Sequence, residues 1–408
     1  MKITLLTFGS RGDVQPFVAL AKGLQRAGHM VKLAAPQRFA AFSARHGVPF
    51  APLPGDPEVI SRRLNSAGRN PFKMVSGMYG YVMEIAAQVL RASYAACQDA
   101  DLVVHSFLFT SGGHAFARQR GIPDVSVQIF PMFAPTRAFP NPAAAHLPPG
   151  LSSYFSHAFS TFVFHRFGNL GYHRLLAGDK SLPRLKLSWP FDEGTPLLMA
   201  FSPRVVTRPS EWDRPGIHMP GYFFLDESES YQPPAELARF LEAGEAPVCV
   251  TFGSMIHAEA ERIYAAVREA LAQTGSRAVI LSGWGGARAE NTNKDVLYME
   301  AAPHDWLLPR CKFVVHHGGS GTTAAGLRAG IPAVVLPHAA DQPFWGRRVA
   351  AIGAGPAPLD LRKLTGQGLA EAFEQAASQP IRARAAELGS LLHAEDGVDE
   401  AVRIIENI

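Results

Sequence analysis

The sequence predicts an α/β protein with two doubly wound units, each a parallel sheet with helices on both faces. Three observations lead to this prediction. The length of 408 residues is too great for one ordinary core and suggests two or three units. Short apolar runs alternate with segments of helical periodicity in both halves of the chain. A proline-rich polar segment separates the two halves.

The composition is that of a globular protein able to bury a large core, with 47% hydrophobic and 18% charged residues. The net charge is only +4, and the chain has no Lys/Arg run of the kind that follows a nucleic-acid backbone. We therefore expect no nucleic-acid partner. A mildly basic surface is compatible with peripheral contact with anionic membranes, although net charge alone does not establish it.

The cysteines and the N-terminus bear on the cellular compartment. Cys97, Cys249 and Cys311 lie far apart and form neither a metal-ligand spacing nor a disulfide framework, which favours a reducing compartment. The first apolar run is short and leads into a glycine turn and a charged pair, so we interpret it as a buried strand. No stretch reaches the roughly 18 apolar residues that a transmembrane helix needs. We expect a cytoplasmic protein.

The first half of the chain, residues 1–202, is expected to form one domain of alternating strands and helices. Lys2–Phe8 is an apolar, β-rich run followed by a glycine-rich turn. A helix follows from about Val14 to Ala27, and Gly28 closes it as a C-terminal cap. Further strands are expected at 30–35, 102–106 and 124–130.

An aromatic stretch interrupts this alternation between residues 130 and 189. It is rich in Phe, Tyr, Pro and Leu, and its periodicity is broken. One interpretation is helical core packed under the first sheet. The other is the wall of an apolar pocket for an acceptor, because such clefts are mostly aromatic with few polar groups. In that case the candidate binding residues are Phe130, Phe133 and Phe139.

The second half is expected to repeat the α/β pattern. Residues 203–234 are typical of a linker, and residues 235–392 form the second domain. Strands are expected there at 247–252, 278–281, 296–299, 313–316 and 333–336, with a helix at about 259–274. The end of the chain, 393–408, contains an amphipathic helix whose placement the sequence leaves open.

The strongest functional signal is HHGGSGTT at 316–323, which follows an apolar strand and precedes a helical stretch at 324–329. Such a turn aims unpaired backbone N–H groups and the positive end of a helix dipole at one point, where a diphosphate can bind. The segment matches neither a Walker loop nor the G-x-G-x-x-G fingerprint. The alternative is a tight turn with a histidine that only packs.

Asp341 and Gln342 follow the next strand end, within PHAADQP at 337–343. An Asp accepts hydrogen bonds and a Gln both donates and accepts, so the pair suits neighbouring sugar hydroxyls. Alone, such a pair is more often a helix N-cap with its neighbour. Beside a phosphate turn it indicates a sugar pocket.

These segments resemble the donor-binding signature of the nucleotide-sugar-dependent glycosyltransferases of family 1. The likeness is greatest to the sterol glucosyltransferases and to the bacterial glycopeptide and polyketide glycosyltransferases. It rests on PHDWL at 303–307, HGGSGTT at 317–323, DQPFW at 341–345 and GSRGDVQP at 9–16. It implies the GT-B fold, two facing Rossmann-like domains, and an inverting transfer that needs no metal and no cofactor.

The resemblance also implies the substrates and the donor site. The donor implied first is UDP-glucose, although plant relatives stack a tryptophan on uracil where this chain has Ala301. The acceptor is a hydroxyl of a sterol, polyketide or other lipophilic natural product. Asp341 and Gln342 would hold the sugar. The other implied donor-binding residues are His317, Gly319, Ser320, Gly321 and Thr322 at the diphosphate, Gly253 and Ser254 opposite them, and Pro303, His304 and Asp305 at the base.

Asp13 is the candidate catalytic base. An inverting transfer needs a base that deprotonates the acceptor hydroxyl as this attacks the anomeric carbon. Asp13 lies on the glycine-rich turn after the first strand, where it can face a ligand. The alternative role is the N-cap of the helix that starts at Val14, and the two roles are compatible. Many plant relatives carry a histidine–aspartate dyad in this place. His105 and Ser106 fall near the second position of that dyad, and a structural role is favoured for them.

Other functions stay open from the sequence alone. A sugar-nucleotide epimerase or hydrolase on the same fold would need no apolar acceptor wall, which the aromatic stretch offers. A non-catalytic glycosyltransferase-like activator would have no need of an intact Asp13, His317 and Asp–Gln pair. An oxidoreductase would explain the first turn but leave the second phosphate turn unused. No local motif encodes the acceptor, the regiochemistry or the oligomeric state.

Overall fold

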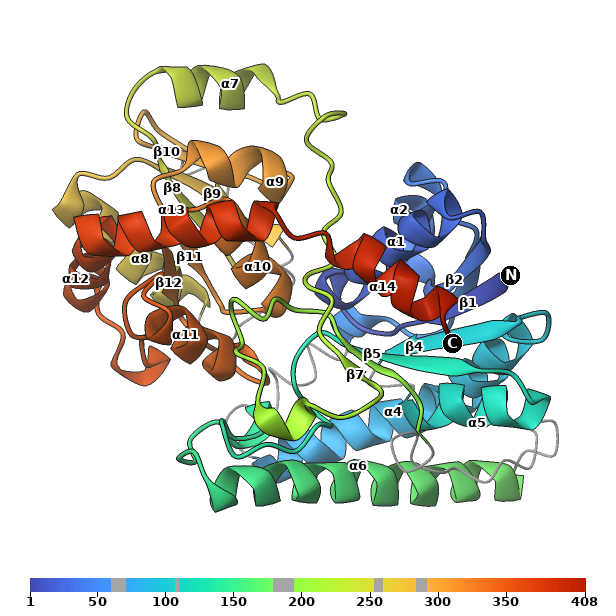
Figure 1. The fold of residues 1–408 in the computed structure, drawn as a ribbon. Coiled ribbons are helices and arrows are strands. Elements are labelled where there is room, and N and C mark those ends of the chain that lie inside the picture. The colour runs from blue at the N-terminus through green and yellow to red at the C-terminus, as the bar shows by residue number, and fades with distance from the viewer. Residues whose placement is uncertain (60–70, 107–109, 179–193, 253–259, 284–291) are drawn as a thin grey trace. The chain divides into compact units, whose positions relative to one another are not determined.

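The computed structural model describes residues 1–59, 71–106, 110–178, 194–252, 260–283 and 292–408 (Figure 1). They form two compact units. Unit 1 consists of Met1–Pro203, Thr207–Leu225 and Asp396–Ile408, and unit 2 of Arg204–Val206 and Asp226–Glu395. Within the described residues, no helix has the length and apolar character that crossing a bilayer requires.

Unit 1 is built on a seven-stranded sheet with the order β3-β2-β1-β4-β5-β6-β7. Its strands are β1 (Lys2–Leu6), β2 (Met30–Pro36), β3 (Phe50–Leu53), β4 (Leu102–Ser106), β5 (Asp124–Gln128), β6 (Leu197–Met199) and β7 (Ile217–His218). All neighbouring pairs are parallel. The strand order reverses between β1 and β4, and in such sheets ligands bind beyond the carboxyl ends of the strands at this point.

Helices cover both faces of this sheet (Figure 1). They are α1 (Arg11–Arg26), α2 (Ala40–Arg45), α4 (Pro71–Ala96), α5 (Thr110–Arg120), α6 (Leu151–Gly178) and α14 (Gly397–Glu406). One core layer joins α1, α2 and α14 to the strands, and the opposite layer joins α4 and α5 to them. Helix α6 lies outside α4 and is therefore the outermost layer of the unit (Figure 1).

The C-terminal helix α14, which the sequence leaves unplaced, packs in unit 1. Its apolar face, with Val398, Val402 and Ile405, belongs to the same buried core as the strands and α1. At the surface, Arg26 of α1 pairs with Asp399 at 2.8 Å. The chain therefore returns to its first unit after completing the second.

The proline-rich segment predicted as a linker at 203–234 is mostly part of unit 1, which corrects its extent. Residues 207–225 pack with the first sheet and contribute its edge strand β7. The Trp212 side chain is fully buried, and its Nε1 donates to the Ala134 carbonyl at 3.1 Å. The buried Trp212 side chain thus holds this segment in unit 1, although prolines favour exposed connections.

Unit 2 contains a five-stranded parallel sheet with the order β10-β9-β8-β11-β12. The strands are β8 (Val248–Thr251), β9 (Ala278–Leu281), β10 (Val296–Met299), β11 (Val314–His316) and β12 (Ala333–Val335). The helices are α7 (Ala235–Glu242), α8 (Ala260–Thr274), α9 (His304–Leu307), α10 (Ser320–Arg328), α11 (Gln342–Ala351), α12 (Gly366–Ala377) and α13 (Gln379–His393). Here the order reverses between β8 and β11, so the turn after β11 lies at the expected ligand edge.

Candidate functional site

Asp13 lies in the first turn of α1 and caps it in a different way from the one predicted. The helix begins at Arg11 with Ser10 as its N-cap, so the predicted N-cap position of Asp13 is wrong. Asp13 Oδ2 accepts hydrogen bonds from the Ser10 backbone N–H at 2.7 Å and from the Ser10 hydroxyl at 3.0 Å. A carboxylate in the first turn that binds back to the N-cap backbone is one half of a capping box.

The surroundings of this carboxylate favour proton transfer. Gly9 has a φ of +146°, and a Cβ on it would lie 2.2 Å from Asp13 Oδ2, so only glycine lets the carboxylate sit this close. Burial raises the pKa of Asp13 to about 6, although the hydrogen bonds from Ser10 lower it. Such a carboxylate is ionised at neutral pH and is a stronger base than an exposed aspartate.

His105, at the end of β4, belongs to a buried polar network. Its Nε2 lies 2.8 Å from Asp124 Oδ2, and the same carboxylate contacts His114 Nδ1 at 3.1 Å. Burial raises the pKa of Asp124, but the hydrogen bonds and charges of the two histidines outweigh this and hold it below its usual value. The network ties β4 to β5 and α5, which supports the structural role favoured for His105.

The three candidate acceptor residues differ in burial. Phe133 is only 2% exposed, and its ring lies 5.5 Å from that of Phe164. Phe139 meets Trp212 edge to face at 5.7 Å and is partly buried, as is Phe130. Phe133 is therefore core of unit 1. Acceptor binding by these three residues stays a prediction.

The phosphate turn is a helix N-terminus in the structure. Gly319 is the N-cap of α10, which begins at Ser320 and therefore four residues earlier than predicted. Ser320, Gly321 and Thr322 thus form the first turn, where backbone N–H groups lack partners within the helix. These groups and the helix dipole make the turn suitable for an anion.

His317 lies directly against this helix start. A Cβ on Gly319 would come within 2.5 Å of His317 Nε2, so glycine is what admits the ring. Burial, with smaller contributions from the charges of His316 and His304, lowers the pKa of His317 to about 3, which makes the ring neutral. Its Nδ1 is buried and has no hydrogen-bond partner within the described part of the chain. A buried polar atom beside an anion site suits a ligand.

Two further histidines shape the turn, and the sequence prediction assigns neither a role. His316 is fully buried, and its Nδ1 accepts the Gly318 N–H at 3.1 Å, which fixes the backbone before the helix. The His338 ring stacks on Phe252 at 5.6 Å and lies 6.4 Å from the His317 ring. The position of His338 at a strand end, three residues before Asp341, is the signal that could have indicated it.

The Asp341–Gln342 pair is anchored in the protein. Gln342 is buried, and its Oε1 accepts the backbone N–H groups of His338 and Ala339 at 2.8 and 3.0 Å. The Trp345 indole N–H donates to Asp341 Oδ2 at 2.8 Å. The oxygen of Gln342 therefore shapes the loop, and Trp345 orients the carboxylate that is expected to meet a sugar.

The structure describes three of the remaining predicted donor residues, Pro303, His304 and Asp305. Asp305 Oδ2 accepts the backbone N–H groups of Glu227 and Ser228 at 2.8 and 2.7 Å, so it ties α9 to the segment that enters unit 2. Pro303 is the N-cap residue of α9, and His304 begins that helix. Gly253 and Ser254 lie outside the described residues.

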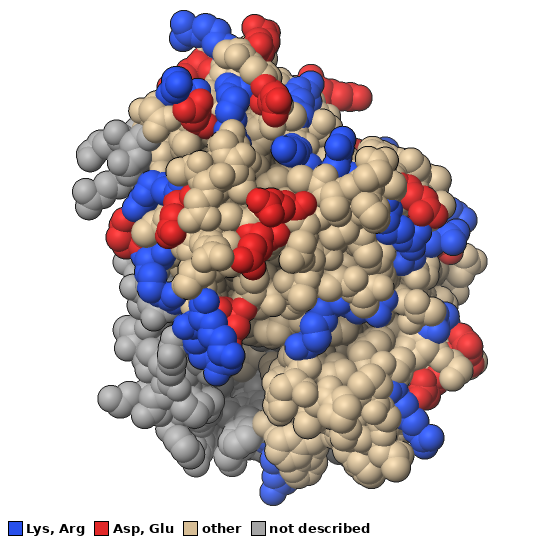
Figure 2. Space-filling view, turned by 90° about the vertical axis from the view of Figure 1, so that its left-hand side faces the viewer, with Lys and Arg blue, Asp and Glu red and all other residues tan. Residues whose placement is uncertain are grey.

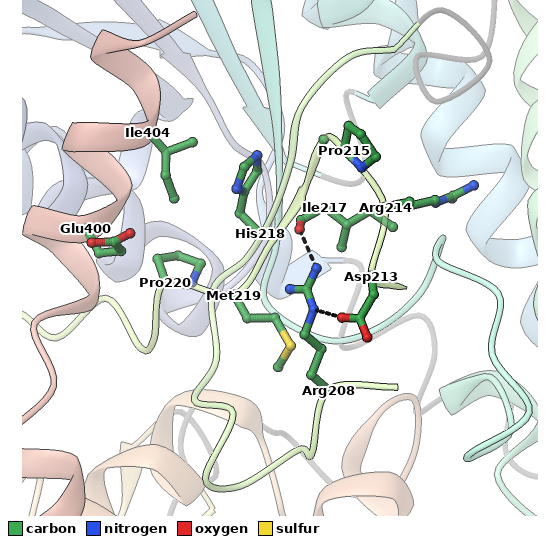
Figure 3. A pocket seen from close by; sticks show the side chains of 11 residues that line it. Arg208, Asp213, Arg214, Pro215, Ile217, His218, Met219, Pro220, Glu400 and Ile404 are labelled. Carbon is green, nitrogen blue, oxygen red and sulfur yellow. Dashed lines mark hydrogen bonds and ion pairs between the residues drawn. The ribbon is translucent and has the colours of Figure 1, made fainter. Parts of the chain in front are cut away.

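A pocket of about 380 Å³ lies elsewhere in unit 1 (Figure 3). It is lined by residues of 208–220 and by Glu400 and Ile404 of α14. Its Arg208 is already bound to Asp213 Oδ1 at 2.7 Å and to the Ile217 carbonyl at 2.9 Å. None of the predicted site residues lines this pocket, so it has no part in the candidate site.

Comparisons with known proteins identify the family. The glycosyltransferase family 28 N-terminal domain matches residues 3–138, and the erythromycin biosynthesis protein CIII-like C-terminal domain matches residues 286–408. Sterol 3-beta-glucosyltransferase UGT80B1 of Arabidopsis thaliana is 33% identical, over 98% of this chain and 67% of its own length. The chain therefore belongs to the same glycosyltransferase family as UGT80B1.

Further family members and solved structures agree. UGT80A2 of Arabidopsis thaliana is 35% identical over 99% of this chain, which spans 65% of that protein. The sterol 3-beta-glucosyltransferase of Neurospora crassa is 33% identical, and this chain spans 27% of it. The glycosyltransferase of kitacinnamycin superposes with a TM-score of 0.70 at 20% identity over 100% of this chain and 98% of its own. CalG4, the calicheamicin glycosyltransferase, gives 0.68 at 18%, over 100% and 97%. The predicted GT-B fold is confirmed.

Proposed function

We propose that this family member is an inverting, metal-independent glycosyltransferase that moves glucose from UDP-glucose to the hydroxyl of a sterol or of a similar lipophilic alcohol. The observation that carries this proposal is the neutral, buried His317 beside the N-terminus of α10. The sterol acceptor is taken from the names of the relatives that match most of this chain.

The α10 turn would bind the diphosphate of the donor and stabilise it as a leaving group. Negative charge grows on the diphosphate as the bond to the anomeric carbon breaks. The backbone N–H groups of the first turn and the helix dipole favour that charge. Neutral His317 can donate a hydrogen bond through one ring nitrogen. Together these groups would supply the stabilisation that a metal ion supplies in other transferases.

Asp13 would act as the general base. Its carboxylate takes the proton of the acceptor hydroxyl, and the oxygen attacks the anomeric carbon from the side opposite the diphosphate. The bond between that carbon and the phosphate oxygen breaks, and its electron pair leaves with UDP. One displacement of this kind inverts the anomeric configuration. Protonated Asp13 then returns its proton to water.

The sugar and the base are assigned by different features. Asp341, oriented by Trp345, would accept hydrogen bonds from the glucose hydroxyls. Uracil is the base implied by the family resemblance. Thymine is the runner-up, because solved structures of the fold relatives SsfS6 and VinC contain thymidine diphosphate. The cysteines Cys97, Cys249 and Cys311 are free and buried, and we place the activity in the reducing cytoplasm on that basis.

Titration calorimetry tests the donor site. The purified protein is titrated with UDP, dTDP, ADP and NAD in buffer with a chelator of divalent metals. We expect binding of UDP, or of dTDP in its place, and none of ADP or NAD. Binding of NAD, or of none of the four, would overturn the interpretation of the His317 turn. A strict need for added metal would overturn the metal-independent mechanism.

A further inference from the structure

Helix α6 of unit 1 has its polar and apolar faces reversed. The side chains that point into the unit are Ser153, Ser156 and His157, which are 0%, 9% and 0% exposed. The side chains that point outward are Leu151, Phe155, Phe159 and Phe162, which are 60%, 65%, 68% and 63% exposed. A helix at the surface of a globular protein normally does the opposite. Core packing therefore does not account for the apolar face of α6.

Hydrogen bonds fix this orientation. The Ser156 hydroxyl accepts the Asn141 backbone N–H at 2.9 Å, and His157 Nε2 lies 3.2 Å from the Phe139 carbonyl. The Ser153 hydroxyl donates to the Pro148 carbonyl at 2.8 Å. Turning the phenylalanines inward would break these buried bonds and leave polar groups unsatisfied. The outward apolar face is thus built into the fold of the segment that precedes the helix.

The outward residues form one continuous stripe. Phe155, Phe159 and Phe162 are spaced by four and three residues, which places them on the same side of a helix. Exposed Arg166 continues this side one turn later. Contiguous exposed apolar surface of this kind marks an interaction site on a soluble protein.

The charge of the segment indicates the partner. Between Asp124 and Asp179 the chain contains no acidic residue, whereas it contains Arg137, Arg166 and Arg174. In Figure 2, the described surface at the lower right is mostly uncharged, with a few blue and red side chains at its edge. Apolar and aromatic side chains next to cations, without anions, are typical of helices that lie in the interface of an anionic bilayer.

We propose that α6 docks the protein on membranes that contain anionic lipids. The stripe Phe155, Phe159 and Phe162 would enter the boundary between head groups and acyl chains, and Arg166 would meet lipid phosphates. This surface uses none of the residues assigned to the donor or to proton transfer. It would place the protein at the phase in which a lipophilic acceptor is dissolved.

Vesicle flotation tests this proposal without any sugar donor. The full chain is mixed with vesicles of phosphatidylcholine, with and without 30 mol% phosphatidylserine. We expect the wild type to float with the anionic vesicles. The triple variant Phe155→Ser, Phe159→Ser, Phe162→Ser should bind at least about tenfold more weakly, because three aromatic side chains no longer enter the bilayer. Arg166→Glu should weaken binding to the anionic vesicles only.

Matched controls show whether the effect belongs to this stripe. Met30→Ser removes another apolar side chain of unit 1 that is 63% exposed, and should bind vesicles like the wild type. Thermal unfolding shows whether the triple variant is folded, and the three single variants replace it if it is not. Wild type that fails to float, or serine variants that all float equally, would overturn the proposal.

Two other binding partners of the stripe would give different experimental results. If the wild type does not float and the variants turn a dimer into a monomer in sedimentation, the stripe is an interface between copies of the chain. If the variants bind vesicles normally but lose turnover on a water-soluble acceptor, the stripe is an acceptor wall. Either result overturns membrane docking. UDP calorimetry is independent of vesicles, so failure here and failure of the proposed function are distinguishable.

Discussion

Ser10 donates two hydrogen bonds to a single oxygen of Asp13, one from its backbone N–H at 2.7 Å and one from its hydroxyl at 3.0 Å. The carboxylate that we propose as the base therefore also holds the start of α1. Capping and catalysis, which are alternatives in the sequence, are compatible in this geometry. Substitutions can separate the two roles, because an amide can still cap the helix but cannot take up a proton at neutral pH.

Asp13→Asn should lower kcat by at least about 100-fold, because general-base catalysis contributes roughly 10²–10⁴-fold. The dissociation constant of UDP should change by less than about twofold, since the donor turn is in unit 2. Steady-state kinetics and calorimetry measure the two quantities. Asp99→Asn, which alters an exposed aspartate of unit 1, is the matched control. Turnover that survives in the Asn variant would show that Asp13 only caps the helix.

The pH dependence of kcat/KM should report the Asp13 carboxyl. Its pKa is raised to about 6 by burial, so the protonated form, which cannot act as a base, accumulates below that pH. We expect activity to rise with pH along an acidic limb centred near 6. Ser10→Ala removes a hydrogen bond that lowers the pKa, and should move this limb to higher pH. A limb that stays in place would indicate that another group controls the profile.

His317→Ala should weaken UDP binding by about tenfold, the effect expected for the loss of one hydrogen bond to a charged group. Gly319→Ala should also weaken it, because the new Cβ would displace the His317 ring. His393→Ala, an exposed histidine of the same unit, is the control. Calorimetry between pH 5 and 8 should show no titration of His317, since its pKa is about 3. Unchanged affinity in both variants would mean that the ring only packs.

Trp345→Phe should separate recognition of the sugar from recognition of the nucleotide. The variant keeps an aromatic ring but loses the N–H that donates to Asp341 at 2.8 Å. We expect KM for UDP-glucose to rise several-fold, while the dissociation constant of UDP stays the same. The two ligands serve as internal controls for each other. An equal loss for both would show that Trp345 supports the whole site and does not orient a sugar ligand.

Asp124→Asn should destabilise the protein by about 3 kcal/mol, the range measured when one partner of a buried ion pair is removed. Asp99→Asn breaks an exposed pair with Lys32 and should cost less than about 1 kcal/mol. Urea unfolding measures both.

The effect of Asp124 should also depend on pH. The histidine partners hold its pKa below the usual value, so its contribution is present above about pH 4 and is lost as the pH falls further. Equal urea concentrations at the unfolding midpoint of the Asp124 and Asp99 variants, measured at neutral pH, would contradict the structural role of the network of His105, His114 and Asp124.

Local pattern was enough to predict the alternating strands, the two doubly wound units and the turn at His317, and the resemblance to family 1 glycosyltransferases implied the GT-B fold. Local pattern places the helix starts too late, because Gly12 and Gly321 are poor helix formers and no local pattern shows that Ser10 and Gly319 are the N-caps. Gln342 was interpreted as a sugar ligand, since nothing in the sequence shows that its oxygen binds two backbone N–H groups.

Contacts between distant segments account for the rest. The docking of α14 on α1 joins residues that lie almost the whole chain apart, and no local motif encodes it. The aromatic stretch could not be assigned to core or pocket wall from composition. Phe133 is core, whereas Phe155, Phe159 and Phe162 face outward because serines and a histidine on the other side of α6 are hydrogen-bonded inside.

Product analysis tests the central claim most directly. The protein is incubated with UDP-glucose and a 3β-hydroxysterol in the presence of a metal chelator, and the lipid extract is analysed by mass spectrometry and NMR. We predict a steryl glucoside whose anomeric configuration is opposite to that of the donor, with none formed by Asp13→Asn. Free glucose without glucoside, or a glucoside with retained configuration, would contradict inverting transfer to a lipophilic acceptor.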